Sequence, residues 1–194
     1  MPEAPLPRPL AASQAAAAQP PRTIYIACPW TPVGGGMFKV ADYLIQAQGR
    51  AGEGDAQLRP LDTRGAGSPA RSLLVLASAL GKLVRGRLSG QVAGVHVNMA
   101  ERLSLVRKSA VVVACRALGL PVVLHLHAAQ LHHAYRAFPG WGRALVRWVF
   151  SLPQTCVVLG RASADFVTRD LGVAPERVEI VINGVPEPTL PRRT

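Results

Sequence analysis

The 194-residue sequence predicts an α/β fold built on a Rossmann-like, doubly wound and mostly parallel sheet of six strands. Short apolar runs alternate along the chain with longer stretches whose apolar residues recur at helical spacing. The short runs are apolar throughout rather than at every second residue, which is typical of strands that helices bury on both faces. At about 100 to 200 residues per domain, the length fits one such domain.

The first half of the chain contains three strand–helix units. β-Branched residues dominate the first run, which Pro29 closes, and Gly49 and Gly52 end the helical pattern that follows. The elements expected here are, in order, a strand at 23–28, a helix at 37–48, a strand at 57–61, a helix at 71–84, a strand at 92–97 and a helix at 101–118.

The second half repeats the alternation with shorter elements. Gly119 precedes its first strand, and Gly172 ends its last helical stretch. The elements expected here are a strand at 121–127, a helix at 142–150, a strand at 155–159, a helix at 164–171 and a strand at 178–182. In such sheets ligands bind beyond the carboxyl ends of the strands, so we expect the functional residues in the loops that follow them.

The composition of the two ends differs from that of the domain. Residues 1–22 hold six of the 17 prolines and an alanine tract, which predicts a disordered or extended leader. We expect the domain to span residues 23–185 and an inter-domain linker to begin at residues 186–194. The three cysteines lie in apolar runs, so we expect buried thiols in a reduced, cytoplasmic protein.

Positive charge is concentrated in the middle of the chain. The whole sequence has 22 Lys and Arg against 11 Asp and Glu. Between Arg71 and Arg161 there are twelve basic residues and one acid, Glu101, which gives that window a net charge of +11. Such an asymmetry indicates an anionic partner, which is a phosphate-bearing ligand, an acidic membrane surface or nucleic acid. A merely solvated face is the alternative, and charge alone does not lead us to expect nucleic-acid binding.

A glycine-rich loop follows the first expected strand. Gly34, Gly35 and Gly36 lead directly into a helix that carries Lys39, and such a helix start attracts phosphate groups. Lys39 stands where a dinucleotide fingerprint needs its last glycine, although Asp62 lies where a ribose-binding acid is found in that motif. The loop also lacks the G-K-[ST] ending of a Walker motif. We therefore interpret the three glycines and Lys39 as a phosphate-binding site that belongs to neither motif.

Four histidines occur within nine residues, at positions 125, 127, 132 and 133. Strand alternation places His125 and His127 on one face, with His127 at the exit of the strand. Imidazole at that place can bind a hydroxyl or a phosphate, or move a proton. His125 is interpreted as a packed core residue. No acid or cysteine completes a ligand set nearby, so no metal is expected.

Four motifs carry a resemblance to a known family. They are Pro32–Gly36 before a helix, Pro121–His127, Val157–Gly160 and Val178–Val185, in this order. Together they resemble the N-terminal, acceptor-binding domain of family 4 glycosyltransferases, which have the GT-B fold. The stretch 98–127 is most similar to the branch that builds bacterial surface polysaccharides.

The resemblance implies a retaining, metal-independent transfer of a sugar from a nucleotide-sugar, with no further cofactor. Gly35 and Gly36 would lie against the donor diphosphate, and His127 would contact the transferred sugar. Arg107 and Lys108 are expected to bind substrate, and Asn183 and Gly184 to form the hinge toward the second domain. The C-terminal donor domain of the family is not expected in the remaining residues, so we expect little turnover from this chain alone.

The implied partners are a nucleotide-sugar donor and a lipid-linked or saccharide acceptor. We also expect a peripheral contact with the anionic inner face of the membrane, and a separate chain that carries the donor domain is a further hypothesis. The alternatives are a non-catalytic binding or regulatory module, a split subunit, and a dinucleotide-dependent oxidoreductase.

Overall fold

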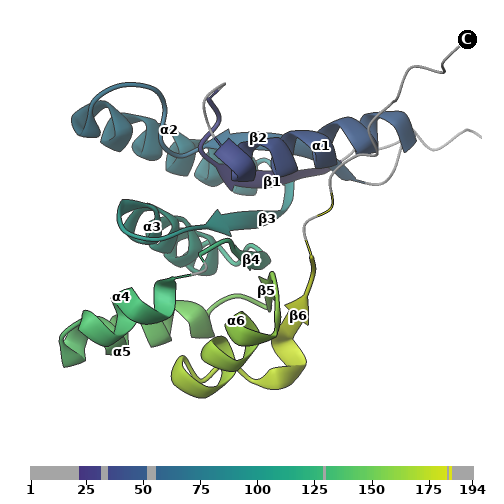
Figure 1. Cartoon of the computed structure of the whole chain (residues 1–194). Coiled ribbons are helices and arrows are strands. Elements are labelled where there is room, and N and C mark those ends of the chain that lie inside the picture. Colours follow the sequence, from purple (N-terminus) through teal and green to yellow (C-terminus); the bar gives the residue numbers. More distant parts are fainter. Residues whose placement is uncertain (1–21, 32–34, 52–55, 129, 183, 185–194) are drawn as a thin grey trace, which may run out of the picture.

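The computed structural model describes residues 22–31, 35–51, 56–128, 130–182 and 184, and it confirms the expected α/β fold (Figure 1). Of the expected leader only Arg22 is described, and it is the first residue of a strand. The expected linker at 186–194 lies outside the described residues.

Six strands form one sheet in the order β2-β1-β3-β4-β5-β6, and every neighbouring pair is parallel. The strands are β1 Arg22–Cys28, β2 Ala56–Asp62, β3 Val92–Met99, β4 Val122–Leu126, β5 Thr155–Val158 and β6 Val178–Ile180. Each overlaps a strand expected from the sequence. The chain goes outward from β1 to β2 and then crosses back to β3, so the topological switch lies between β1 and β3.

Helices connect the strands and lie on both faces of the sheet. They are α1 Gly35–Ala51, α2 Pro69–Leu88, α3 Leu103–Ala117, α4 Leu131–Ala137, α5 Gly140–Ser151 and α6 Arg161–Asp165. A π-helical turn at Phe166–Asp170 continues α6, and a 3₁₀ turn covers Pro175–Arg177. None of the helices in the described part of the chain is long and apolar enough to cross a membrane.

The short helix α4 is not among the elements expected from the sequence. Its seven residues are too few to display a helical period, and its N-cap residue Gln130 makes no side-chain capping bond. Leu131 and Tyr135, four residues apart, are both buried in the main core. Tertiary packing of these two side chains therefore stabilises a helix that the local sequence pattern does not predict.

The two faces of the sheet are covered unequally. Alternate strand residues such as Ala27, Val97 and Leu124 belong to the main core, which they form with α2, α3 and α5. The opposite face has a much smaller cluster of Ile26, Cys28 and Ala41 under α1. Right-handed crossovers put the β1-to-β2 connection on that second face and the later ones on the other. Among the helices that the structure describes, α1 is therefore the one that covers the second face, over β1 and β2.

The second face therefore remains partly open beside α1. A groove of about 810 Å³ lies there, and most of its lining is apolar. Tyr43 and Leu44 of α1 form one side, and Val157 and the two histidines His96 and His125 lie on its sheet floor. The groove ends toward the carboxyl edge of the sheet, where the candidate site begins.

Helix α2 illustrates how local sequence sets the bounds of an element. Ser68 is the N-cap residue, its hydroxyl accepts the backbone N–H of Arg71, and Pro69 takes the first helical position. The turn after the helix includes Gly90 with φ +69°, a conformation that glycine adopts without strain. Within the helix, Gly86 faces Val92 of β3 so closely that there is no room for a Cβ atom.

Replacing Gly86 with alanine is expected to lower the free energy of unfolding by about 1 to 3 kcal/mol, because the new methyl group collides with Cγ2 of Val92. Gly81→Ala in the same helix is the control. A Cβ atom there meets nothing within 4 Å, so the better helix former should raise the free energy of unfolding by about 0.5 to 1 kcal/mol. Urea unfolding measures both. Stabilisation by both substitutions would contradict the close packing of α2 on β3.

Candidate functional site

The candidate site lies at the carboxyl edge of the sheet, around the switch between β1 and β3. The loop after β1 leads to α1 on one face, whereas the loop after β3 leads to α3 on the other. In parallel sheets of this kind, ligands bind beyond the strand ends at such a switch. Arg102, just before α3, has φ 56°, so the backbone is strained at this edge in a residue that is not glycine.

The start of α1 lies at this edge of the sheet, because α1 follows β1. Gly35, with φ +68°, and Gly36 are both exposed, and a Cβ atom at either would meet nothing within 4 Å. The exposed Lys39 follows in the next turn, and the first turn contains no acid. The N–H groups of a first helical turn have no partner within the helix, so this end favours an anion. Gly34, the fourth expected phosphate-site residue, lies outside the described residues.

The carboxylate of Asp62 fixes two loops at the same edge. Its oxygens accept the backbone N–H groups of Trp30, Arg64 and Gly65 at 2.9 to 3.2 Å. The Trp30 ring in turn meets the ring of Phe38 in α1 edge-on, with centroids 4.9 Å apart. The Asp62 carboxylate thus has a structural role as an acceptor of backbone hydrogen bonds. This role argues against the ribose binding that a dinucleotide-dependent oxidoreductase would require.

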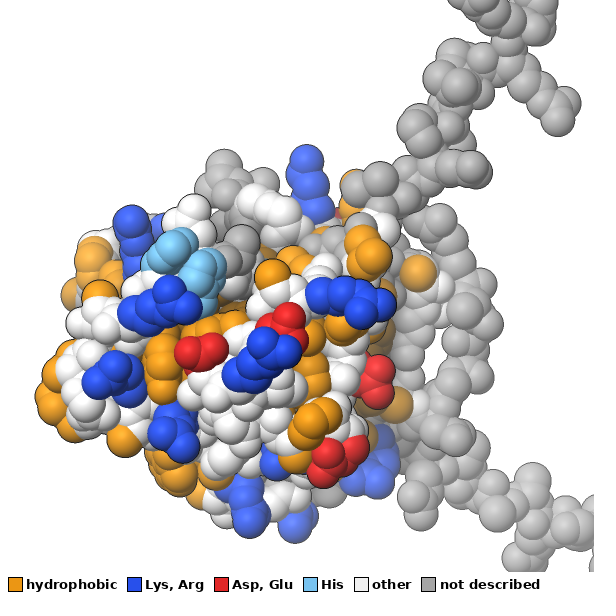
Figure 2. Space-filling model, turned by 60° about the horizontal axis from the view of Figure 1, so that its bottom comes forward, with side chains coloured by type: hydrophobic (Ala, Val, Ile, Leu, Met, Phe, Trp, Pro, Cys, Tyr) orange, Lys and Arg blue, Asp and Glu red, His pale blue; other side chains and the backbone are white. Residues whose placement is uncertain are grey.

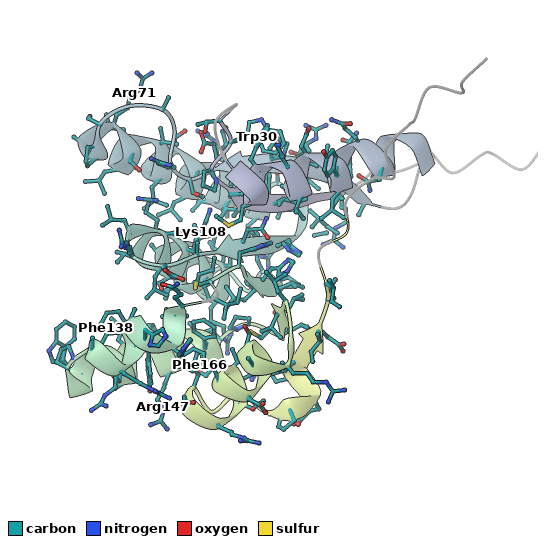
Figure 3. All side chains as sticks on the ribbon, viewed as in Figure 1. Trp30, Arg71, Lys108, Phe138, Arg147 and Phe166 are labelled. Carbon is teal, nitrogen blue, oxygen red and sulfur yellow. The ribbon has the colours of Figure 1, made fainter. Side chains whose placement is uncertain are left out.

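Lys108 lies inside the protein rather than on its surface. Its side chain is 1% exposed, and Nζ donates a hydrogen bond to the buried hydroxyl of Thr63 after β2. Figure 3 shows Lys108 between α3 and the layer that contains β1 and β2. Burial lowers the pKa of Lys108 to about 7, although the thiol of Cys28 and the carboxylate of Asp62 oppose this shift. Its place in the structure therefore suits positioning of the edge better than direct contact with a substrate.

Arg107, the neighbour of Lys108, is half-buried and lies in the second turn of α3. Burial lowers its pKa, and the positive charge of Arg64 lowers it further. Arg64 belongs to the loop after β2 and was not expected from the sequence. Two guanidinium groups that repel each other are stabilised by an anion that binds near both.

His127 and Asn98 meet at the end of the two central strands. The backbone N–H of His127 donates to the carbonyl of Met99 at 2.7 Å, which continues the β3–β4 ladder past Leu126. Nε2 of His127 lies 3.3 Å from Oδ1 of Asn98. Because an amide oxygen only accepts, this contact places the imidazole proton on Nε2 and leaves Nδ1 as an acceptor.

The other histidines of this face complete a buried polar layer. The rings of His125 and His127 are 4.0 Å apart, which confirms that they share a face. Nε2 of His96 lies 3.3 Å from Nδ1 of His125. His96 was not expected from the sequence, because it lies 29 residues before His125. Its position two residues before Asn98, on the same face of β3, is the signal that could have revealed it.

Burial keeps these imidazoles neutral. Removal from water lowers the pKa of His125 to about 3 and that of His127 to about 4, and each is lowered further by its histidine neighbours. Burial also lowers the pKa of His96, although a hydrogen bond that its imidazole donates to the side chain of Asn98 opposes this shift. At neutral pH His127 is thus a hydrogen-bonding group rather than a cationic acid.

Two buried polar atoms of this layer have no partner in the described part of the chain. They are Nδ2 of Asn98 and Nε2 of His125, which belong to side chains that are 1% and 5% exposed. Buried polar groups in folded proteins are nearly always hydrogen-bonded, so such atoms indicate a place where a hydroxyl group or a water molecule binds.

The remaining two histidines of the predicted cluster lie elsewhere. His132 and His133 belong to α4, where His133 is exposed and His132 borders a smaller pocket of about 290 Å³ between α4 and α6. The four histidines thus form two separate pairs. Among the residues that the structure describes, no group of three or more His, Cys, Asp or Glu side chains is placed to hold a metal ion.

The expected hinge is described only in part. Asn183 lies outside the described residues, whereas Gly184 is exposed and borders the apolar groove together with Val181 and Ile182. The three cysteines are buried and free, as the sequence predicts.

A family model matches residues 35–187, from the start of α1 to beyond β6, and its description is Glycosyltransferase Family 4. The match spans well over half of the sequence. The chain belongs to glycosyltransferase family 4. In this family 4 domain the matched residues contain α1, the polar layer and the carboxyl edge described above. A comparison with curated proteins finds no match.

The difference in the free energy of unfolding between the wild-type protein and Lys108→Met is expected to depend on pH. The pKa of Lys108 is about 7 in the folded protein and 10.5 in an unburied lysine, so between these values the unfolded chain binds a proton that the folded protein lacks. Wild-type stability should therefore rise relative to the variant as the pH increases through this window, by at most about 1.4 kcal/mol per pH unit.

Denaturant unfolding at several pH values measures this difference. Lys82→Met is the control, because Lys82 is exposed on α2 and its surroundings change little on unfolding. A flat difference for Lys108→Met, equal to that of Lys82→Met, would show that the ammonium group is not buried.

Proposed function

We propose that this domain is the acceptor side of a retaining glycosyltransferase that takes its sugar from a nucleotide-sugar, with no metal or other cofactor. One observation carries the proposal: in a chain of glycosyltransferase family 4, a neutral His127 oriented by Asn98 stands at the carboxyl edge of the sheet. The proposed setting is the biosynthesis of a polysaccharide or a glycolipid.

The start of α1 is the proposed seat of the donor diphosphate. The N–H groups at Gly35 and Gly36, which have no partner within the helix, and the charge of Lys39 favour phosphate there. Only β3 separates β1 from β4, so the carboxyl ends of these two strands are two strand spacings, or about 10 Å, apart across the sheet. A sugar attached to a diphosphate is long enough to reach from one to the other.

His127 is proposed to hold a hydroxyl group of the transferred sugar. Its Nδ1 atom is the free acceptor, because Asn98 holds the proton on Nε2. A neutral imidazole binds a hydroxyl group without bringing a positive charge next to the sugar carbon, where positive charge develops in glycosyl transfer. His127 therefore positions and stabilises the sugar and does not protonate it.

Arg107 and Arg64 are proposed to face the acceptor. Their mutual repulsion favours an acceptor with a phosphate group, such as a lipid-linked saccharide, over a neutral sugar. Lys108 supports this wall from inside through Thr63. Asn183 and Gly184 are proposed as the hinge to a donor domain, which the same or a separate chain supplies, and the enzyme would act in the cytoplasm at the inner face of the membrane.

Substitutions of His127 test its role in the 194-residue chain joined to the donor domain of a family 4 enzyme. Sugar transfer from a nucleotide-sugar should fall by about a hundredfold in His127→Ala, in line with the loss of one aligned hydrogen-bonding group at a reacting centre. His127→Asn should retain more activity than His127→Gln. The side-chain amide of asparagine reaches the position of Nδ1, the atom proposed to bind the sugar, whereas the amide of glutamine reaches the position of Nε2.

His133→Ala is the control, because His133 is exposed on α4. Near-wild-type transfer by His127→Ala would show that His127 does not hold the transferred sugar. Acceptor binding without any transfer by the joined wild-type protein would favour a non-catalytic binding module.

A further inference from the structure

Exposed apolar side chains lie at the start of three neighbouring helices. They are 50% to 74% exposed and fall within the first two turns of α2, α3 and α5. We call this set the apolar rim, and its members are Leu73, Leu74, Leu103, Val106, Trp141 and Leu145. Single exposed apolar residues are common on protein surfaces, but six in one region of the fold indicate a contact surface.

The topology puts the starts of α2 and α3 at the carboxyl edge, because a connecting helix in a parallel sheet begins near the carboxyl end of the preceding strand. Helix α5 follows α4 rather than a strand, and Figure 1 shows it beside α4 at the same end of the molecule. Helix α3 contacts both α2 and α5, so α3 lies between the other two helices. Figure 1 shows these helices reaching the left side of the view, toward which the arrow of β3 points.

The charged residues around the rim are almost all basic. Arg71, Arg102 and Arg143 are exposed at the same three helix starts. The acid next to them, Glu101, accepts the backbone N–H of Gln130. In Figure 2 hydrophobic side chains gather at the left end of the molecule, and Lys and Arg side chains are spread over the face beside them.

We propose that the apolar rim rests on an anionic lipid bilayer. Leucine, valine and tryptophan enter the boundary between head groups and acyl chains, while the arginines meet the negative lipid phosphates. A soluble protein partner would match the apolar residues equally well but would need an acidic surface around them, whereas an anionic membrane supplies both properties over its whole area. The proposal rests on the proposed function in one respect. A lipid-linked acceptor that binds at the carboxyl edge would explain why this edge faces the membrane.

The experiment measures co-sedimentation of the full 194-residue chain with vesicles, in the absence of any sugar substrate. Vesicles of phosphatidylcholine alone are compared with vesicles that also contain phosphatidylglycerol, at low and at high salt. The chain should sediment with the anionic vesicles at low salt, and high salt should weaken this binding because it screens the arginines.

Two matched substitutions in α2 test whether binding depends on the apolar rim or on any exposed apolar residue. Leu74→Ser lies in the rim, whereas Leu88→Ser lies at the other end of α2, where Leu88 is 82% exposed. Leu74→Ser and Trp141→Ser should each weaken partitioning into anionic vesicles by about tenfold, since each removes a side chain that enters the bilayer. Leu88→Ser should bind like the wild-type protein. All three positions are exposed, and thermal unfolding checks that each variant stays folded.

Equal binding by Leu74→Ser and Leu88→Ser would overturn the proposal, as would a lack of binding to anionic vesicles at low salt. A concentration-dependent dimer that Leu74→Ser abolishes, without vesicle binding, would assign the rim to a protein interface instead. Because no sugar substrate is present, a lack of vesicle binding would not contradict the proposed transfer reaction. Conversely, an inactive enzyme that still binds vesicles would not contradict the proposed role of the apolar rim.

Discussion

The right-handed crossover of parallel strands is the constraint on which the rest of this structure depends. The chain leaves β1 in one direction and every later connection runs in the other, so α1 covers one face of the sheet and α2, α3 and α5 cover the opposite face. The same constraint puts the topological switch between β1 and β3, brings the carboxyl ends of the strands to one edge, and leaves an apolar groove beside α1. Site, groove and apolar rim are consequences of one topological choice.

The carboxyl edge is organised by polar groups that the fold takes out of water. Asp62 is fixed by three backbone N–H groups, Lys108 by Thr63, and His127 by Asn98. Burial lowers the pKa of His125 to about 3 and that of His127 to about 4, so the polar layer supplies hydrogen-bonding groups that carry no charge at neutral pH. Such groups are expensive to bury, and the main core on the other face of the sheet supplies the compensating stability. A preorganised neutral site suits the binding of sugar hydroxyl groups.

The sequence predicts what local pattern encodes. The apolar run of β1, the helical spacing of α3 and the shared face of His125 and His127 were all expected, because strand and helix periods are visible in single segments. What it does not predict depends on contacts between distant segments. Lys108 looks like part of a basic surface pair with Arg107, and only the packing of α3 against Thr63 buries it. His96 and Arg64 join the site through strand pairing and loop placement, and α4 exists through tertiary packing.

The account depends most on the carboxyl edge being the ligand-binding edge. Amide chemical shifts of the isotope-labelled chain, recorded during titration with a panel of nucleotide-sugars, test this directly. We expect at least one nucleotide-sugar to shift the amide signals of Gly35, Gly36 and His127, while those of Tyr43 and Leu44 in the apolar groove remain unchanged. Shifts confined to the groove residues, with the signals of Gly35 and His127 unmoved by every nucleotide-sugar, would contradict the assignment of this edge to sugar transfer.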